Sequence, residues 1–157
     1  MATVEIKRLT KQFGNVKAVS GVDLLVNDGE FFVLLGSSGC GKSTLLRMIA
    51  GIESPTAGGI LIGGWVVNDL PPQARQVAMV FQSYALYPHM TVFKNIAFPL
   101  NVQGMGREVI GEKVKRAATM FGIEHLLDRK PRQLSGGERQ RVGVARALAA
   151  EPTMLLL

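Results

Sequence analysis

The glycine-rich run from residue 36 to residue 44 is the part of the sequence best suited to chemistry, because it fits the pattern G-x-x-x-x-G-K-[ST]. Its members are Gly36, Ser37, Ser38, Gly39, Cys40, Gly41, Lys42, Ser43 and Thr44. A tight glycine turn lets consecutive backbone N–H groups converge on one anion, and a helix that begins there adds its positive end. In such a loop Lys42 reaches the β- and γ-phosphates, and the Ser43 hydroxyl completes the Mg²⁺ shell. The pattern therefore predicts a nucleoside triphosphate site.

The residues that flank this loop predict the elements that would position it. Residues 31–35 are all apolar, which is typical of a strand buried on both faces in a parallel sheet. Residues 42–50 have a helical pattern, and Gly51 supplies the expected stop. A strand before the loop and a helix after it are the context that phosphate binding requires.

A second motif lies at residues 134–141, with the sequence LSGGERQR. Ser135 stands where a helix N-cap is expected and Glu138 follows three residues later, which predicts a capping box. Gly136 and Gly137 leave the backbone N–H groups of this helix start uncovered, so a phosphate could bind there as well. Taken alone, this motif could equally be a well-capped surface helix without a ligand. The phosphate-binding pattern at residues 36–44 favours phosphate binding here as well.

The remaining patterns predict three pieces. Strands are expected at residues 3–9 and 21–27, a hairpin at 58–67, a second buried strand at 77–81 and a third beginning at 154–157. Helices are expected at 91–98, stopped by Pro99, at 108–121, and from 134 to about 150. In the second of these helices, one apolar face consists of Val109, Ile110, Val114, Ala117 and Phe121. The organisation is α/β: an antiparallel sheet, a nucleotide-binding core, and a helical block inserted between core strands.

The bulk composition indicates one globular domain. The chain has 157 residues, 47% of them hydrophobic and 19% charged, and no apolar run approaches the length needed to cross a bilayer. A single cysteine excludes an internal disulfide and fits a reducing compartment. The net charge of +6 is compatible with nucleic-acid binding, but a phosphate-attracting surface explains it equally well. His89 and His125 lack partners at metal-ligand spacing, so we expect neither to bind a metal.

Taken together, the motifs resemble the ATPase subunit of ATP-binding cassette (ABC) transporters over essentially the whole chain. The resemblance is carried by the Walker A loop GSSGCGKST, the segment VFQSYALYPHMTV around Gln82, and the signature LSGGERQR. The strings LLRMIAG and PPQAR are most similar to the maltose and glycerol-phosphate class of carbohydrate importers. Glu138 stands where the family more often has Gln, a difference that the capping box tolerates.

The resemblance implies a RecA-like P-loop NTPase fold with three subdomains. Residues 1–30 and 55–75 would form the antiparallel β subdomain. Residues 31–54, 76–90 and 151–157 would form the P-loop core, and 91–150 the helical subdomain with the signature motif.

The resemblance also implies a role for each matching residue. The Walker A residues 36–44 would bind ATP, with Ser43 and Gln82 on Mg²⁺. Gln82 would in addition sense the attacking water, and it is the expected catalytic residue. Phe13 lies where the family stacks an aromatic ring on adenine, although it could instead be a core residue of the first hairpin. Ser135, Gly136 and Gly137 would contact the γ-phosphate held by an opposite subunit.

The partners implied are a second ABC ATPase subunit in a head-to-tail dimer and transmembrane permease subunits. The permease would dock beside residues 82–91, where Tyr84, Leu86, Tyr87 and Met90 are either contacts or packing residues. No nucleic acid and no membrane span of its own are expected, and the protein would lie in the cytoplasm on the inner face of the membrane.

In the family, an Mg²⁺-binding Asp and a catalytic Glu follow the third core strand, and neither lies within these 157 residues. We therefore expect this chain to bind nucleotide at most and not to hydrolyse ATP efficiently, since phosphoryl transfer depends on positioned charge. The sequence leaves open whether a natural end or a cut explains this.

A second hypothesis is an ABC-type ATPase of DNA repair or chromosome maintenance. Those proteins carry coiled-coil or zinc-bearing insertions inside the cassette. Only about fifty residues separate Gln82 from Leu134 here, without heptads or a C-x-x-C pair, so transport is favoured.

Overall fold

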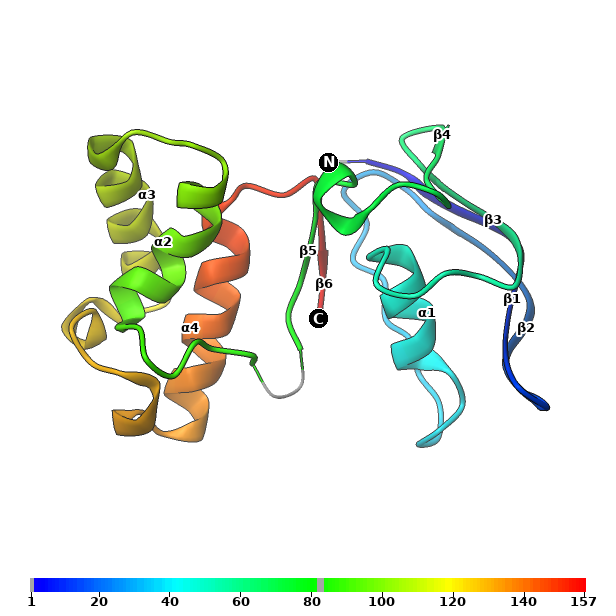
Figure 1. Ribbon diagram of the computed structural model, residues 1–157, viewed down its shortest axis with the longest axis horizontal. Coiled ribbons are helices and arrows are strands. Elements are labelled where there is room, and N and C mark those ends of the chain that lie inside the picture. Colours follow the sequence, from blue (N-terminus) through cyan, green and yellow to red (C-terminus); the bar gives the residue numbers. More distant parts are fainter. Residues whose placement is uncertain (1, 82–83) are drawn as a thin grey trace. The chain divides into compact units, whose positions relative to one another are not determined.

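The computed structural model describes residues 2–81 and 84–157, and the chain divides into two compact units. The N-terminal unit runs up to Val77, and the helical unit runs from Ala78 to Leu155; Leu156 groups with the first and Leu157 with the second. Each unit is described by itself below, and Figure 1 gives the labels of its elements.

A four-stranded antiparallel sheet forms the framework of the N-terminal unit. Its strands are β1 (Val4–Phe13), β2 (Val16–Val26), β3 (Ala57–Ile62) and β4 (Trp65–Val66), in the order β2-β1-β3-β4. The strands predicted at residues 3–9 and 21–27 and the hairpin predicted at residues 58–67 are confirmed. The first two strands are longer than predicted because Phe13 pairs with Val16 across a tight turn. Gly14 in this turn has φ +53°, a conformation that glycine adopts without steric cost.

Helix α1 (Lys42–Ile49) packs its buried residues Leu45, Met48 and Ile49 into the N-terminal unit. It ends as predicted, because Gly51 has φ +76° and takes the left-handed conformation that terminates a helix. The buried Arg75 follows a short 3₁₀ helix, η1 (Pro72–Ala74).

The predicted strand at residues 31–35 is wrong. These residues belong to neither sheet of the described chain, and Phe31 and Leu35 are 86% and 88% exposed. A strand satisfies its backbone groups through neighbouring strands, so an apolar run without a pairing partner does not become one.

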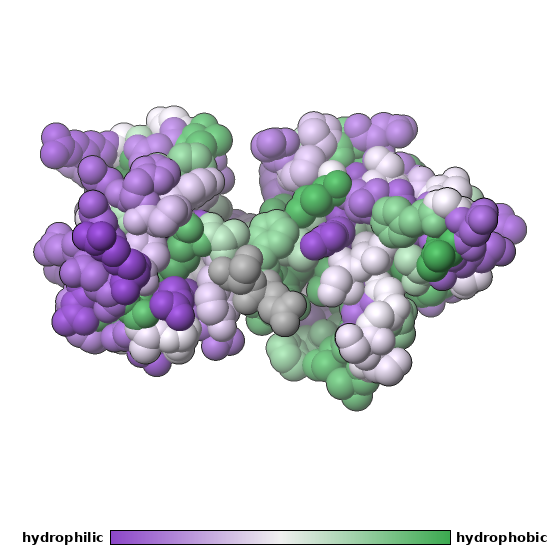
Figure 2. All heavy atoms as spheres, turned by 60° about the horizontal axis from the view of Figure 1, so that its bottom comes forward, coloured by the Kyte–Doolittle hydropathy of each residue, from purple (hydrophilic) through white to green (hydrophobic). Residues whose placement is uncertain are grey.

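On the face seen in Figure 2, hydrophilic residues dominate the helical unit, whereas hydrophobic groups (green) are more widely exposed on the N-terminal unit.

Three helices surround the core of the helical unit: α2 (Val92–Val102), α3 (Arg107–Met120) and α4 (Gly136–Ala149) (Figure 1). Short 3₁₀ helices η2 (Glu124–Leu126) and η3 (Pro131–Gln133) connect α3 to α4. The innermost core residues are fully buried: Val92, Ile96, Leu100, Val114, Ala118, Ile123, Leu126, Val142 and Ala145. Strands β5 (Val77–Met79) and β6 (Met154–Leu156) form a two-stranded sheet. Both strands were predicted, although β5 ends at Met79 rather than at residue 81, and their pairing was not predicted.

Two helical details differ from the predictions. Pro99 does not stop α2, which continues to Val102, because Leu100 beyond it is fully buried and the Pro99 carbonyl accepts a bond from the Gln103 N–H. Tertiary burial of the last turn therefore outweighs the missing proline N–H. On α3 the buried face includes Ile110, Val114 and Ala117, but Val109 is exposed. The fourth buried position is Ala118, so the apolar stripe is rotated from the predicted one.

Candidate nucleotide-binding site

The loop at residues 36–44 has a backbone that glycine makes possible. Gly39 and Gly41 have φ values of +82° and +96°, in the left-handed region. A Cβ on Gly41 would lie 2.2 Å from the Ala18 carbonyl oxygen of β2, which cannot move aside because it is backbone. On Gly36 a Cβ would meet the Cys40 Sγ at 2.7 Å. The loop therefore passes so close to β2 that only glycine fits at position 41.

Lys42 folds back over this loop. Its Nζ donates to the carbonyl oxygens of Gly36 and Ser37, both at 2.8 Å, and lies 3.5 Å from the Cys40 Sγ. The ammonium is thus held by the loop's own acceptors, at the place where a triphosphate would need a positive charge.

The N-terminus of α1 has room for an anion. Its N-cap residue Gly41 has no side chain to cap the helix, and the first turn carries no acidic residue. By contrast, Thr91 caps α2 and Ser135 caps α4. The first N–H groups of a helix need an acceptor, and together with the helix dipole they favour phosphate. This terminus fits a phosphate group better than the N-termini of the two capped helices.

Among the residues that the structure describes, no group of three or more His, Cys, Asp or Glu side chains could hold a metal ion. This is compatible with Mg²⁺, which uses one or two protein oxygens and completes its shell with phosphate and water. The exposed Ser43 hydroxyl in the first turn of α1 is a suitable protein donor.

Phe13, at the end of β1, lies on the surface rather than in the core. It is 47% exposed, and the Lys11 Nζ lies 4.7 Å from its ring centroid. Lys11 is itself fixed by Glu53 at 2.6 Å and by the Ser54 carbonyl at 2.7 Å. One face of the ring is therefore covered by a cation, a contact that the sequence analysis did not foresee.

The signature motif forms the start of α4, as predicted. The Ser135 Oγ accepts from the Glu138 N–H at 3.3 Å, and the Ser135 N–H donates to Glu138 Oε2 at 2.6 Å. Hydrogen bonding of the Glu138 carboxyl group with Ser135, first with its side chain and then with its backbone N–H, lowers the pKa of Glu138. Ser135, Gly136 and Gly137 are all exposed. The capping box uses the N–H groups of Ser135 and Glu138 and leaves those of the two glycines facing outward.

Gln82 lies outside the described residues. The segment that follows it, from Tyr84 to Thr91, is held by two polar side chains of the helical unit. Arg146 of α4 donates to the carbonyls of Tyr84 and Ala85. Burial lowers the pKa of Arg146, a cost that these two bonds offset.

The second side chain is Asn95 of α2, which is fully buried. Its Oδ1 accepts from the Tyr87 N–H at 2.8 Å, and its Nδ2 donates to the carbonyls of Tyr87, Met90 and Thr91. The sequence analysis missed Asn95, although a lone amide in the largely apolar segment 92–100 was a signal of a buried polar anchor.

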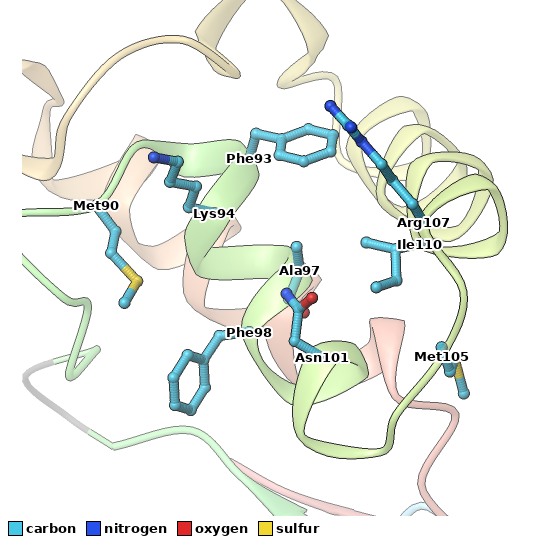
Figure 3. Close-up of a pocket in the computed structure, with 9 residues that line it drawn as sticks. All are labelled: Met90, Phe93, Lys94, Ala97, Phe98, Asn101, Met105, Arg107 and Ile110. Carbon is cyan, nitrogen blue, oxygen red and sulfur yellow. The ribbon is translucent and has the colours of Figure 1, made fainter.

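The helical unit also carries an open pocket of about 610 Å³ between α2 and α3. Figure 3 shows Phe93, Lys94, Phe98 and Asn101 contributed by α2 and Arg107 and Ile110 by α3. Met90, Ala97 and Met105 complete the lining. The pocket is therefore mostly apolar with two cationic groups, which suits a partner surface with apolar and acidic side chains.

Comparisons with known proteins agree with these features. Residues 19–157 match the family described as ABC transporter. The chain is 54% identical to the sulfoquinovosyl glycerol transport ATP-binding protein of Agrobacterium fabrum, covering 99% of this chain and 44% of that protein. It is 51% identical to the maltose/maltodextrin import ATP-binding protein of Salmonella typhimurium, covering 100% of this chain and 42% of that protein. The chain thus spans less than half the length of these relatives.

Solved structures support the same assignment. A dimeric bacterial ABC transporter cassette superposes with a TM-score of 0.89 at 34% identity, covering 97% of this chain and 72% of that one. A cassette dimer in a post-hydrolysis state bound to ADP and Pi gives a TM-score of 0.88 at the same identity and coverage. The expected fold class, an α/β P-loop NTPase, is therefore confirmed. No described helix is both long and apolar enough to cross a membrane. With its glycine loop, capped signature helix and these matches, the chain belongs to the ABC transporter family of ATP-binding proteins.

Proposed function

We propose that this chain is the ATP-binding part of a motor subunit that couples ATP binding and hydrolysis to the import of a solute, with carbohydrate as the substrate class. The observation that carries the proposal is the uncapped N-terminus of α1 beside the Lys42 ammonium. The relatives named above act on a sugar glycerol and on maltodextrins, both rich in hydroxyl groups. Relatives from other organisms are named for sn-glycerol-3-phosphate import.

In this proposal the Walker A loop binds ATP. The N–H groups of residues 37–44 and the Lys42 ammonium contact the phosphates, and Phe13 stacks on adenine with the ring face that Lys11 does not cover. The Ser43 hydroxyl and Gln82 would hold Mg²⁺, which would supply positive charge to the phosphates. Gln82 also orients the attacking water.

The proposed partners follow from two segments of the helical unit. Ser135, Gly136 and Gly137 offer backbone N–H groups to the γ-phosphate bound by a second cassette, in a head-to-tail dimer. Permease subunits dock beside residues 82–91, and the adjoining pocket between α2 and α3 extends this surface from Met90. The protein would then lie on the cytoplasmic face of the membrane. These relatives are named for transport, so an ATPase of DNA maintenance is not favoured.

A chimaera tests the proposal directly. The matching segment of the Salmonella maltose import ATP-binding protein is replaced by these 157 residues, and ATP-dependent maltose uptake is measured in vesicles that contain its permease. We expect uptake to be restored and to be lost again with Lys42→Ala. A chimaera that is folded and assembled but inactive in uptake contradicts the proposal.

A further inference from the structure

The Phe13 ring is held by a cation from its own strand. Lys11 precedes it by two positions on β1, a spacing that places two side chains on one face of a strand. The Lys11 Nζ lies 4.7 Å from the ring centroid, within the range in which an ammonium is attracted to an aromatic face. Because Phe13 is still 47% exposed, this contact covers one side of the ring and leaves another side accessible.

The Lys11 side chain is itself fixed. It is only 12% exposed, and its ammonium forms an ion pair with Glu53 Oε1 at 2.6 Å and donates to the Ser54 carbonyl at 2.7 Å. A lone surface ion pair contributes little, but here a largely covered ammonium has both a carboxylate and a carbonyl as acceptors. The place of the cation against the ring is therefore set by residues outside β1.

These acceptors follow the helix that begins at the glycine loop. Glu53 and Ser54 lie a few residues beyond the end of α1. The N–H groups of Ile52 and Glu53 donate to the Arg47 carbonyl in the last turn of that helix, at 2.9 Å and 3.2 Å. Lys11 thus joins the end of β1 to the C-terminal end of α1, and all of these residues belong to the N-terminal unit.

The backbone beside Phe13 is fixed by other bonds. The Gln12 N–H donates to the Thr56 Oγ1 at 3.0 Å, and the Gln12 Nε2 donates to the Gly14 carbonyl at 2.8 Å. These bonds hold the chain on both sides of Phe13 but do not reach its ring. The direction of the ring therefore depends on side-chain contacts such as that with Lys11.

We propose that Lys11 is a positioning residue for the nucleobase. Its ammonium holds the Phe13 ring from one side, in the orientation in which the other side stacks on adenine. A side chain that is ordered before binding loses less entropy when the ligand arrives, so Lys11 raises the affinity for the nucleoside without touching it. The inference rests on the stacking role proposed above for Phe13 and adds the residue that orients the ring.

The test measures how much the nucleoside part of ATP contributes to binding. The nucleoside gain is defined as the Kd for magnesium tripolyphosphate divided by the Kd for MgATP, both from calorimetric titration of the 157-residue protein. The variants are Lys11→Met, which keeps an apolar stem without the charge, Phe13→Ala, and the double variant.

Two further variants separate position from charge. Lys17→Met is the matched control, because Lys17 is an exposed lysine on the neighbouring strand β2, opposite Gln12. It removes the same charge from the same sheet and leaves the contact between Lys11 and Phe13 in place. Lys11→Arg is the conservative variant, because a guanidinium can also stack on an aromatic ring and pair with a carboxylate.

We expect Lys11→Met to reduce the nucleoside gain about three- to tenfold, because the ring loses its cation and must be ordered when the nucleoside binds. Phe13→Ala should reduce this gain about tenfold. The double variant should lose no more than Phe13→Ala alone, since Lys11 acts through the ring. Lys11→Arg should keep most of the gain, and Lys17→Met should keep all of it.

The inference is overturned if Lys11→Met has the nucleoside gain of the wild type, or if the losses of the two single variants add in the double variant. Circular dichroism checks that each variant is folded. If Lys11→Met does not fold, the cycle is run with Lys11→Gln, which keeps a donor for the Ser54 carbonyl but places no charge at the ring. The same two results contradict the inference there.

Failure of the inference alone leaves MgATP binding by the wild type intact, and the proposed function then stands. An unchanged nucleoside gain in Phe13→Ala would overturn the stacking role and the inference with it. Absence of MgATP binding by the folded wild type would instead overturn the proposed function and the inference together.

Discussion

At the scale of single residues, the site combines groups that are rigid before any ligand arrives. Gly41 is the extreme case, since a methyl group there would overlap the Ala18 carbonyl and its φ lies in the left-handed region. Lys42 is restrained by two loop carbonyls, and Phe13 is restrained by the Lys11 ammonium. Little ordering of these side chains is then needed when a nucleotide binds, which favours affinity.

The exposed Phe13 ring leads to a prediction about the base. Phe13→Ala should weaken MgATP binding about tenfold, because stacking of a base on an aromatic ring contributes about 1–3 kcal/mol. The affinity for magnesium tripolyphosphate, which lacks a base, should stay the same, so this ligand is the matched control. Calorimetric titration with both ligands tests this prediction. An equal loss of affinity for both ligands would show that Phe13 supports the loop rather than adenine.

At the scale of the elements, Arg75 stabilises the C-terminus of α1 from a distance in sequence. It is 5% exposed and donates to the carbonyls of Met48 at 2.7 Å and Ile49 at 3.0 Å, with further bonds to Asn68 and Leu70. Burial lowers the pKa of Arg75, but the guanidinium stays charged near neutral pH. The last carbonyls of the helix are therefore satisfied by a cation, as its dipole favours.

Arg75→Met should destabilise the N-terminal unit by about 2–4 kcal/mol, since several buried carbonyls lose their donor. Arg47→Met, at an exposed position of the same helix, is the matched control and should cost less than about 0.5 kcal/mol. Urea denaturation monitored by circular dichroism measures both. Equal effects of the two substitutions would refute this role for Arg75.

The capping box of α4 predicts a dependence of stability on pH. The hydrogen bonds from Ser135 lower the pKa of Glu138, so its carboxylate stabilises the helix start fully above the pKa of the unfolded chain. This contribution is lost as the pH falls through the lower pKa of the folded protein. Amide hydrogen exchange at the start of α4 should therefore accelerate in acid, after correction for the intrinsic rate.

Glu138→Gln should keep the bond to the Ser135 N–H, since either side chain completes the capping box. It should remove the acceleration of hydrogen exchange in acid, because glutamine does not titrate. Ser135→Ala is the control that removes the bond from the Glu138 N–H to the Ser135 Oγ at every pH, while the backbone N–H of residue 135 can still donate to Glu138. If wild type and Glu138→Gln show the same pH profile, the carboxylate does not contribute as proposed.

The elements that the sequence predicted well are those with local signals. The Ser135–Glu138 box, the stop at Gly51 and the hairpin at residues 58–67 depend on neighbours within a few positions. Residues 31–35 and Pro99 were predicted wrongly because the outcome depends on pairing and burial elsewhere: the first lacks a strand partner, and the second is followed by a buried Leu100. The glycine loop lies where predicted, while the roles given to its side chains stay predictions.

Contacts across long sequence separations could not be predicted. Arg146 lies 61 positions from Ala85, and no periodicity links them. The bonds to Tyr84 and Ala85 form once these residues and α4 belong to one folded unit.

At the scale of the whole molecule, the proposed mechanism needs two copies, because the Walker A loop and the signature would serve different nucleotides. The two solved cassettes that resemble this chain are dimers, and the glycines of the signature are exposed in this chain. Gly137 offers a precise disruption, since a Cβ there would meet nothing within 4 Å. A side chain at this position therefore leaves the fold intact and alters only what approaches the helix start.

Gly137→Asp should abolish MgATP-dependent dimerisation, because its carboxylate repels the γ-phosphate, while ATP binding to the monomer should be retained. Mixing Gly137→Asp with Lys42→Ala should restore a fraction of dimer, since one composite site in each mixed pair is intact. Sedimentation velocity with and without MgATP measures this. The head-to-tail arrangement would be contradicted if Gly137→Asp alone formed dimers. It would also be contradicted if the wild type formed dimers but the mixture of the two variants did not.

The most direct test of the account is calorimetric titration of MgATP into the folded 157-residue protein, with Lys42→Ala as the site variant. Lys7→Ala, an exposed lysine of the same unit, serves as the charge-matched control. The account predicts binding to the wild type and to Lys7→Ala, and binding about 10- to 100-fold weaker in Lys42→Ala, because a charged contact to phosphate is lost. Equal affinities for all three proteins, or no binding by the folded wild type, would show that the loop at residues 36–44 is not a nucleotide site in this chain.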